Sequence, residues 1–213
     1  GTPGTINDKS GNGFNGTVGG SMNTADWVGG KYGSALDFDG VDDVVNIYSS
    51  GFASAFNEKQ GAITMWIKMP SAAAWSDATS NRSAIQIAAD AGSNLIRVMK
   101  SSSGSYISIN YAGAGTFDGY NYTSTRTDWF NLAFVWDKAD EEARVYIDGL
   151  LVDTSPNLGV WSGALASTRV NIGARTSAAV DPFAGSIDNV KIYNYAISAN
   201  RIMGDMGGKN MAT

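Results

Sequence analysis

The stretch WFNLAFVWDKADEEARVYIDGLLV, residues 129–152, contains two complete strands and the start of a third. Residues 129–136 form an apolar run of the length that a largely buried strand requires. Residues 144–147 and 150–152 are further apolar runs that flank the pair Asp148-Gly149. An Asp-Gly pair tolerates the positive φ angles of a two-residue type I′ turn, so this stretch predicts antiparallel strands joined by tight turns.

Short apolar or alternating runs separated by turn residues continue in both directions from this stretch. Further strands are predicted at residues 15–18, 35–38, 44–47, 63–68, 84–87, 95–99, 106–111, 170–173 and 186–193. Residues 71–83 are interpreted as a long loop, and residues 198–203 as one short helix with Ser198 as its N-cap. Many short strands without a long helix predict an all-β fold, a two-sheet antiparallel jelly-roll sandwich.

Composition excludes several classes of protein. The chain has 213 residues, 43% of them hydrophobic and 16% charged, which is enough apolar material for a sizeable core. Its net charge is -5 and it contains no Lys/Arg run, which argues against nucleic-acid binding. No apolar run approaches the ~20 residues of a membrane span. With neither Cys nor His, the chain has no disulfide, no zinc site with such ligands and no His-based catalytic triad.

The domain organisation is predicted to be simple. Residues 1–203 are expected to form one domain, and residues 204–213 a flexible tail rich in Met and Gly. The chain begins with Gly1 instead of Met, and no signal peptide is visible. We therefore expect a processed product, an excised domain or a chain that carries a cleavage scar.

Three segments carry a family resemblance. They are NDKSGNGFNGT at residues 7–17, WVGGKYGSALDFDG at residues 27–40 and FAGSIDNVKIYNYAIS at residues 183–198. In order and spacing they resemble the laminin-G-like jelly roll of the concanavalin A-like superfamily, whose patterns are D-x-S-G-N-G-x-x-G-T, G-K-x-G-x-A-L-x-F-D-G and F-x-G-x-I-D-x-V-x-I-Y-N-x-A-L-S. The resemblance covers nearly the whole chain and implies a concanavalin A-like sandwich.

Two departures from the family pattern stand out. Asn131 occupies the position of a family histidine. Family members also usually open with a strand just before the D-x-S-G-N-G loop, whereas residues 1–6 are not strand-like. Either that strand was lost to processing, or another chain supplies it.

The resemblance implies a structural calcium ion held between the loop around Asp8 and the strand that bears Asp188. Calcium prefers six to eight oxygen ligands, and Asp8, Asn12 and Asp188 can supply carboxylate or amide oxygens. The alternative is that Asp8 and Asn12 form Asx-turns while Asp188 pairs with a lysine. A second acidic cluster, Asp39, Asp42 and Asp43, is interpreted as a solvated turn.

Carbohydrate binding requires exposed aromatic rings with polar neighbours. The candidates in expected loops are Trp75, Asp118, Tyr120, Asn121, Tyr122 and Trp161. Each of these aromatic residues could equally anchor its loop. Trp66, Trp129 and Trp136 lie in strand patterns and are assigned to the core.

No catalytic residue is predicted. Related β-glucanases place two carboxylates about 5–5.5 Å apart, commonly through an E-x-D-x-x-E pattern on one strand. This chain has no such pattern: Glu58 is isolated, and Glu141 and Glu142 lie in a hairpin loop. The chain is therefore not expected to be an enzyme.

Two functions remain in view, with a glycoside hydrolase as a remote third. The first is a non-catalytic binding or adhesion module that recognises a glycan or another ligand on a cell or particle surface, located outside the cell, on the cell surface or on a virion. The second is a structural subunit of a phage particle or extracellular filament. Such a subunit would be completed by strand addition from a neighbouring copy or another chain.

Overall fold

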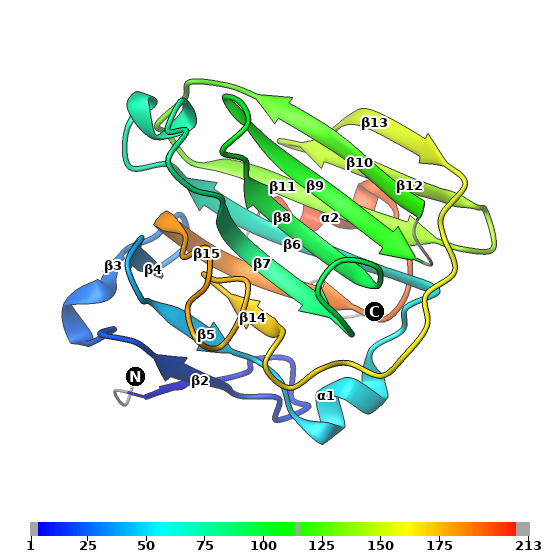
Figure 1. The fold of residues 1–213 in the computed structure, drawn as a ribbon, viewed down its shortest axis with the longest axis horizontal. Helices are drawn as coiled ribbons and strands as arrows, with labels where there is room; N and C mark the ends of the chain where they lie inside the picture. Colours follow the sequence, from blue (N-terminus) through cyan, green and yellow to red (C-terminus); the bar gives the residue numbers. More distant parts are fainter. Residues whose placement is uncertain (1–3, 114–115, 208–213) are drawn as a thin grey trace.

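The computed structural model describes residues 4–113 and 116–207, which form two antiparallel sheets packed face to face (Figure 1). The first sheet has eight strands, in the order β1 (Thr5–Ile6), β2 (Gly16–Gly19), β5 (Val44–Asn46), β14 (Val170–Ile172), β7 (Arg82–Ala88), β8 (Leu95–Lys100), β9 (Tyr106–Gly113) and β10 (Thr116–Thr123). The second has seven, in the order β13 (Leu150–Pro156), β12 (Glu142–Ile147), β11 (Phe130–Asp137), β6 (Gln60–Lys68), β15 (Ala184–Tyr193), β4 (Ser34–Asp39) and β3 (Trp27–Gly29). The predicted fold class is confirmed.

The hairpin between β12 and β13 has the predicted geometry. Asp148 and Gly149 have φ angles of 50° and 78°, both positive as a type I′ turn requires. The Asp148 carboxylate accepts a hydrogen bond from the backbone N–H of Asn131 at 2.8 Å, which ties the turn to β11. The Asn131 side chain, which replaces the family histidine, donates to the Met65 carbonyl at 3.2 Å.

The core lies between the two sheets and is built from alternate residues of each strand. On β6, Ile63, Met65 and Ile67 are fully buried, and on β7 Ile85 and Ile87 are fully buried opposite them. Because side chains alternate between the two faces of a strand, the residues between these positions lie on the outer faces of the sheets.

Helix α2 (Ala199–Met206) packs on the outer face of the seven-stranded sheet. Its Ile202 is fully buried, and its Asp205 is 2% exposed. The Asp205 carboxylate pairs with Lys191 at 3.0 Å and with Arg201 at 3.2 Å, and accepts from the Tyr193 hydroxyl at 2.7 Å. These contacts fix the helix to the last strand.

Several boundaries differ from the sequence prediction. Residues 116–123, which were expected to lie in a loop, form strand β10. The long loop expected at residues 71–83 contains the 3-10 helix η2 (Ala72–Trp75) and the first residues of β7. Helix α2 extends to Met206, so residues 204–206 do not belong to a tail, while residues 208–213 lie outside the described residues.

The short elements β1, β3, α1 (Ser50–Ala55) and η1 (Thr24–Asp26) were not expected. Each spans at most six residues, which is too short for a periodic pattern to develop. None of the helices in the described part of the chain is long and apolar enough to cross a membrane.

Candidate functional site

A row of polar side chains crosses the outer face of the eight-stranded sheet, which is turned toward the viewer in Figure 1. The row runs through directly paired residues of five strands: Asn46 on β5, Asn171 on β14, Gln86 on β7, Arg97 on β8 and Asn110 on β9. Their neighbours along each strand, such as Ile85 and Ile96, are buried in the core. The alternation of the strand therefore places the whole row on the outside.

The first half of this row holds in place the two chain segments that precede and follow β14. Asn46 donates to the Ser167 carbonyl at 2.9 Å, Asn171 to the Thr168 carbonyl at 3.0 Å, and Gln86 to the Arg175 carbonyl at 2.9 Å. Both Asn171 and Gln86 are fully buried beneath these contacts. These amides have a structural role, because each satisfies a backbone carbonyl of the segments on either side of β14.

Arg97 and Asn110 belong to the other half of the row, together with Ser108 and Asn121 on the neighbouring positions of β9 and β10. Asn121 is exposed, Arg97 is half-buried, and Ser108 and Asn110 are buried, with the Ser108 hydroxyl donating to Asn110 at 3.0 Å. The Asn110 amide lies over Gly119, where a Cβ would come within 2.1 Å of it. We call Arg97, Ser108, Asn110 and Asn121 the Arg97 face.

The charge on the Arg97 face is only partly balanced. Among the described residues Arg97 makes no ion pair and its Nε has no hydrogen-bond partner, while its neighbour Arg175 pairs with Asp181 at 3.1 Å. Burial lowers the pKa of Arg97 from its usual value, and the charge of Arg175 lowers it further. Two guanidinium groups thus lie near one carboxylate, which leaves the positive charge of Arg97 without an ion pair of its own in the described chain.

Sequence reasoning predicted Asn121 as a sugar contact but missed Arg97, Ser108 and Asn110. Each polar residue is visible as the centre of an apolar-polar-apolar triplet, but its alignment with the others depends on the register of strands far apart in the chain.

Trp75 was predicted to stack on a sugar, and the structure contradicts this role. Its side chain is 0% exposed, and its Nε1 donates to the Arg126 carbonyl at 2.7 Å. Its ring lies 5.9 Å from both Tyr122 and Phe130, which form one aromatic cluster with it. Trp75 anchors its loop in the core, because a large apolar ring gains more by burial than by exposure.

The other predicted sugar contacts fall in different places. Tyr120 and Tyr122 are half-buried on the core side of β10, whereas Asn121 between them is exposed on the opposite side. Asp118 lies on β10, and its side chain is outside the described residues.

Trp161 is half-buried and lies apart from the Trp75 cluster, with its ring 5.9 Å from Phe56 and 6.1 Å from Tyr111. It lines a small pocket of about 170 Å³ together with Glu58, Lys59 and Lys138. Trp161 is thus a predicted sugar contact that lines a pocket.

The predicted calcium ligands Asp8, Asn12 and Asp188 line one common groove. Asp8 forms the Asx-turn that was considered as the alternative: it accepts from Ser10 N at 2.8 Å and from Phe14 N at 3.0 Å. These bonds lower the pKa of Asp8 although its partial burial, the largest single influence, acts to raise it. Asp188 accepts from Tyr32 N at 2.8 Å and makes no ion pair with a lysine among the described residues.

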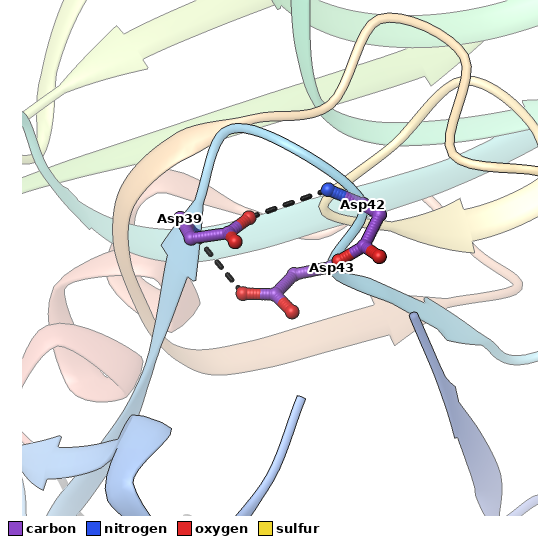
Figure 2. Close-up of side chains that lie close together, drawn as sticks. All are labelled: Asp39, Asp42 and Asp43. Carbon is purple, nitrogen blue, oxygen red and sulfur yellow. Dashed lines mark hydrogen bonds between the residues drawn. The ribbon is translucent and has the colours of Figure 1, made fainter. Parts of the chain in front are cut away.

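The Asp39, Asp42 and Asp43 cluster is the one place in the described chain where three acidic side chains bring oxygens within 4.8 Å of one another (Figure 2). Asp39 accepts from Val41 N at 2.7 Å, and Asp43 accepts from Asp39 N at 3.0 Å, so both carboxylates cap the turn between β4 and β5. Asp43 is 1% exposed, which corrects the prediction of a solvated turn at this residue. Burial raises the pKa of the Asp43 carboxyl, and the negative charge of Asp39 adds to the rise.

Two of the three glutamates form ion pairs, and the third lines a pocket. Glu141 pairs with Lys138 at 2.6 Å and Glu142 with Arg144 at 3.1 Å, both within the hairpin of β11 and β12, and Glu58 lines the small pocket beside Trp161.

Comparison with known families gives a match over most of the chain. The profile described as "Concanavalin A-like lectin/glucanases superfamily" matches residues 39–203. No curated protein matches the chain.

Solved structures show the same fold at low sequence identity. Domain 4 of AbnA, an extracellular GH43 arabinanase from Geobacillus stearothermophilus in complex with arabinotriose, has 18% identity and a TM-score of 0.66, over 94% of this chain and 92% of that one. The CBM40 of the Ruminococcus gnavus IT-sialidase has 15% identity and a TM-score of 0.61, over 81% and 96%. The binding domain of botulinum neurotoxin serotype D has 15% identity and a TM-score of 0.67, over 98% of this chain and 53% of that one.

The burial of Trp75 leads to a stability prediction. Replacement of a buried Trp by Ala typically costs about 3–5 kcal/mol, so we expect Trp75→Ala to lower the free energy of unfolding by that amount in urea titrations. Tyr195→Ala, at a ring that is 42% exposed, should cost less than about 1 kcal/mol. A Trp75→Ala variant of unchanged stability would show that the ring is not a core anchor.

The pKa of Asp43 leads to a second prediction. Because this pKa is higher in the folded chain than in the unfolded one, ionisation of Asp43 opposes folding; the cost is absent at low pH and appears as the pH rises through the folded pKa. Asp43→Asn keeps an acceptor for Asp39 N and removes the charge. At pH 7 we expect its Tm, measured by calorimetry, to rise by about 2–4 °C, the shift that about 1 kcal/mol produces in a chain of this size. A lower Tm at pH 7 would mean that the fold needs the charged carboxylate.

Proposed function

This chain belongs to the concanavalin A-like lectin/glucanases superfamily, and from that premise we propose that it is a non-catalytic module that binds carbohydrate through the Arg97 face. The observation that carries the proposal is Arg97 itself: a half-buried guanidinium without an ion pair in the described chain, flanked by amides of two neighbouring strands. Guanidinium and amide groups donate to sugar hydroxyls and carboxylates, and rigid strands hold them in position.

The location of these groups favours binding over catalysis. The Arg97 face contains no carboxylate pair among its members to act as acid and base. The similar arabinanase domain was solved with arabinotriose, which agrees with a carbohydrate ligand for this fold. We place the module outside the cell or on the surface of a cell or particle, where such ligands are found.

A structural calcium ion at Asp8, Asn12 and Asp188 remains part of the proposal. The three residues line the same groove, and each offers oxygen atoms of the kind that calcium prefers. The fit is partial, because Asp8 already accepts three hydrogen bonds from its own loop, two of them from backbone N–H groups. Main-chain carbonyl oxygens would have to complete the ligand set.

A glycan array that includes neutral and acidic sugars tests the binding face. We expect reproducible binding by the native chain and a loss of about 10–100-fold in Arg97→Ala, since a hydrogen bond to a charged group contributes about 1.5–3 kcal/mol. Asn121→Ala should weaken binding, whereas Arg144→Ala, a matched arginine on the other sheet, should leave it unchanged. If Trp161→Ala abolishes binding and Arg97→Ala does not, the ligand occupies the small pocket and our placement is wrong.

Chelation tests the calcium ion. We expect EDTA to lower the Tm by several degrees and added calcium to restore it, because an ion that binds only the folded state stabilises that state. Asp188→Asn should abolish this response and Asp39→Asn should retain it. The opposite pattern would assign the ion to the Asp39 cluster. A Tm that neither EDTA nor added calcium changes would show that no calcium ion stabilises the fold.

A further inference from the structure

Arg97 lies on the outer face of the eight-stranded sheet, where it pairs with Gln86 of β7 and Asn110 of β9. The residue is half-buried, and its Nε is a buried atom without a hydrogen-bond partner in the described chain. The two terminal nitrogens of the guanidinium are not among the buried atoms that lack a partner, and they donate no hydrogen bond to the described residues. They therefore lie at the surface of the face, where a ligand can reach them.

The charges that act on Arg97 belong to the segment after β14. Gln86 donates to the Arg175 carbonyl at 2.9 Å, and Ser83 N donates to the Asp181 carbonyl at 2.8 Å, so this segment lies along β7, the neighbour of β8. Burial lowers the pKa of Arg97 most, the charge of Arg175 lowers it further, and the charge of Asp181 acts in the opposite direction. Because Arg175 and Asp181 pair at 3.1 Å, the positive charge of Arg97 remains unbalanced.

A half-buried charge without a counter-ion costs free energy, because water is removed from the charged group and no opposite charge replaces it. Arg144, a comparable arginine between core residues of strand β12, has such a counter-ion in Glu142 at 3.1 Å. Arg97 has none in the described chain, although the protein as a whole has a net charge of -5. A ligand that brings a carboxylate would supply the missing charge.

Neutral and acidic sugars differ in what they offer to this group. A hydroxyl accepts a hydrogen bond from the guanidinium but leaves its charge unbalanced. A carboxylate offers two coplanar oxygens to the planar guanidinium, and such charge-assisted bonds are about twice as strong as neutral ones. The exposed amide of Asn121 lies two strands from Arg97, roughly 10 Å across the sheet at the usual strand spacing. A ligand that reaches both residues is therefore longer than one sugar ring.

We propose that the Arg97 face selects an oligosaccharide that carries a carboxylate, with the carboxylate bound to the Arg97 guanidinium and a hydroxyl of a neighbouring sugar bound to Asn121. This inference rests on the proposed function, since it names the class of carbohydrate that the same face binds. Uronic acids and sialic acids both carry the required group.

Calorimetric titration with matched acidic and neutral sugars tests the selection. One pair of probes is trigalacturonate and its methyl ester, which keeps the shape and the hydroxyls but removes the charge. The other pair is sialyllactose and lactose, so the two pairs also distinguish uronic from sialic acids. We expect at least one acid to bind at least 10-fold more tightly than its neutral partner. Neutral partners that bind as tightly as both acids would overturn the selection.

The outcomes separate this inference from the proposed function. If acids and neutral sugars bind equally and Arg97→Ala weakens both, the face binds carbohydrate and only the carboxylate selection fails. If no sugar binds, in these titrations or on the glycan array, both fail. A sulfated galactose trisaccharide that binds more tightly than either acid would overturn the choice of a carboxylate.

Arg97→Gln isolates the charge, because glutamine keeps a donor at this position and is neutral. The preference for the acid should fall to less than about 2-fold, since the pair of charges that produces it is gone. The matched Arg144→Gln, on the other sheet, should keep the full preference. An unchanged preference in Arg97→Gln would overturn the placement. Should that variant fail to fold, Arg97→Lys lacks the planar guanidinium, and unchanged affinity for the acid there would overturn it equally.

Asp181→Asn tests the direction of the effect. Asp181 has a φ angle of 53°, a left-handed conformation that asparagine also adopts. The substitution leaves Arg175 without its carboxylate partner and adds one positive charge to the local balance. Affinity for the acid should therefore rise several-fold, while affinity for the neutral partner stays the same. A weaker affinity for the acid, or an equal change for both sugars, would contradict selection by charge.

Discussion

Burial of alternate side chains between two facing sheets is the constraint from which the other features of this molecule follow. Once Ile63, Met65 and Ile67 of β6 face Ile85 and Ile87 of β7, every intervening residue is committed to an outer face. The two outer faces are used differently. Helix α2 covers one with Ile197 and Ile202, and the other carries amides and an arginine. A slip of one residue in any strand would exchange these surfaces, so the pattern strongly specifies register.

The same constraint explains why the aromatic residues contribute less to the surface than their number suggests. Trp75 and Trp136 are fully buried, and Trp66 is 5% exposed. Large rings supply much of the apolar area that stabilises a sandwich rich in small residues such as glycine. The polar side chains held on the strands are therefore the basis of the proposed binding face, and among them Arg97 has no counter-ion in the described chain.

The two sheets differ in physical character. The Arg97 face is a set of fixed donors on paired strands, suited to a hydroxyl-rich or anionic ligand. In the other sheet, residues 191–193 of β15 pair with β6 alone within the described chain, and Val190 and Ile192 remain half-buried.

Local pattern alone determined most of the strands, the Asp148-Gly149 turn and the helix that begins after Ser198, because each depends on residues adjacent in sequence. The family resemblance predicted Asp8 and Asp188 as ligands of one calcium ion, and the structure places both residues in the lining of one groove. Only the tertiary structure decided that Trp75 is buried, that Tyr120 and Tyr122 face the core, and that Arg97 meets Asn110. The physical reason is that burial and cross-strand alignment depend on contacts between segments far apart in the chain, which no local periodicity encodes.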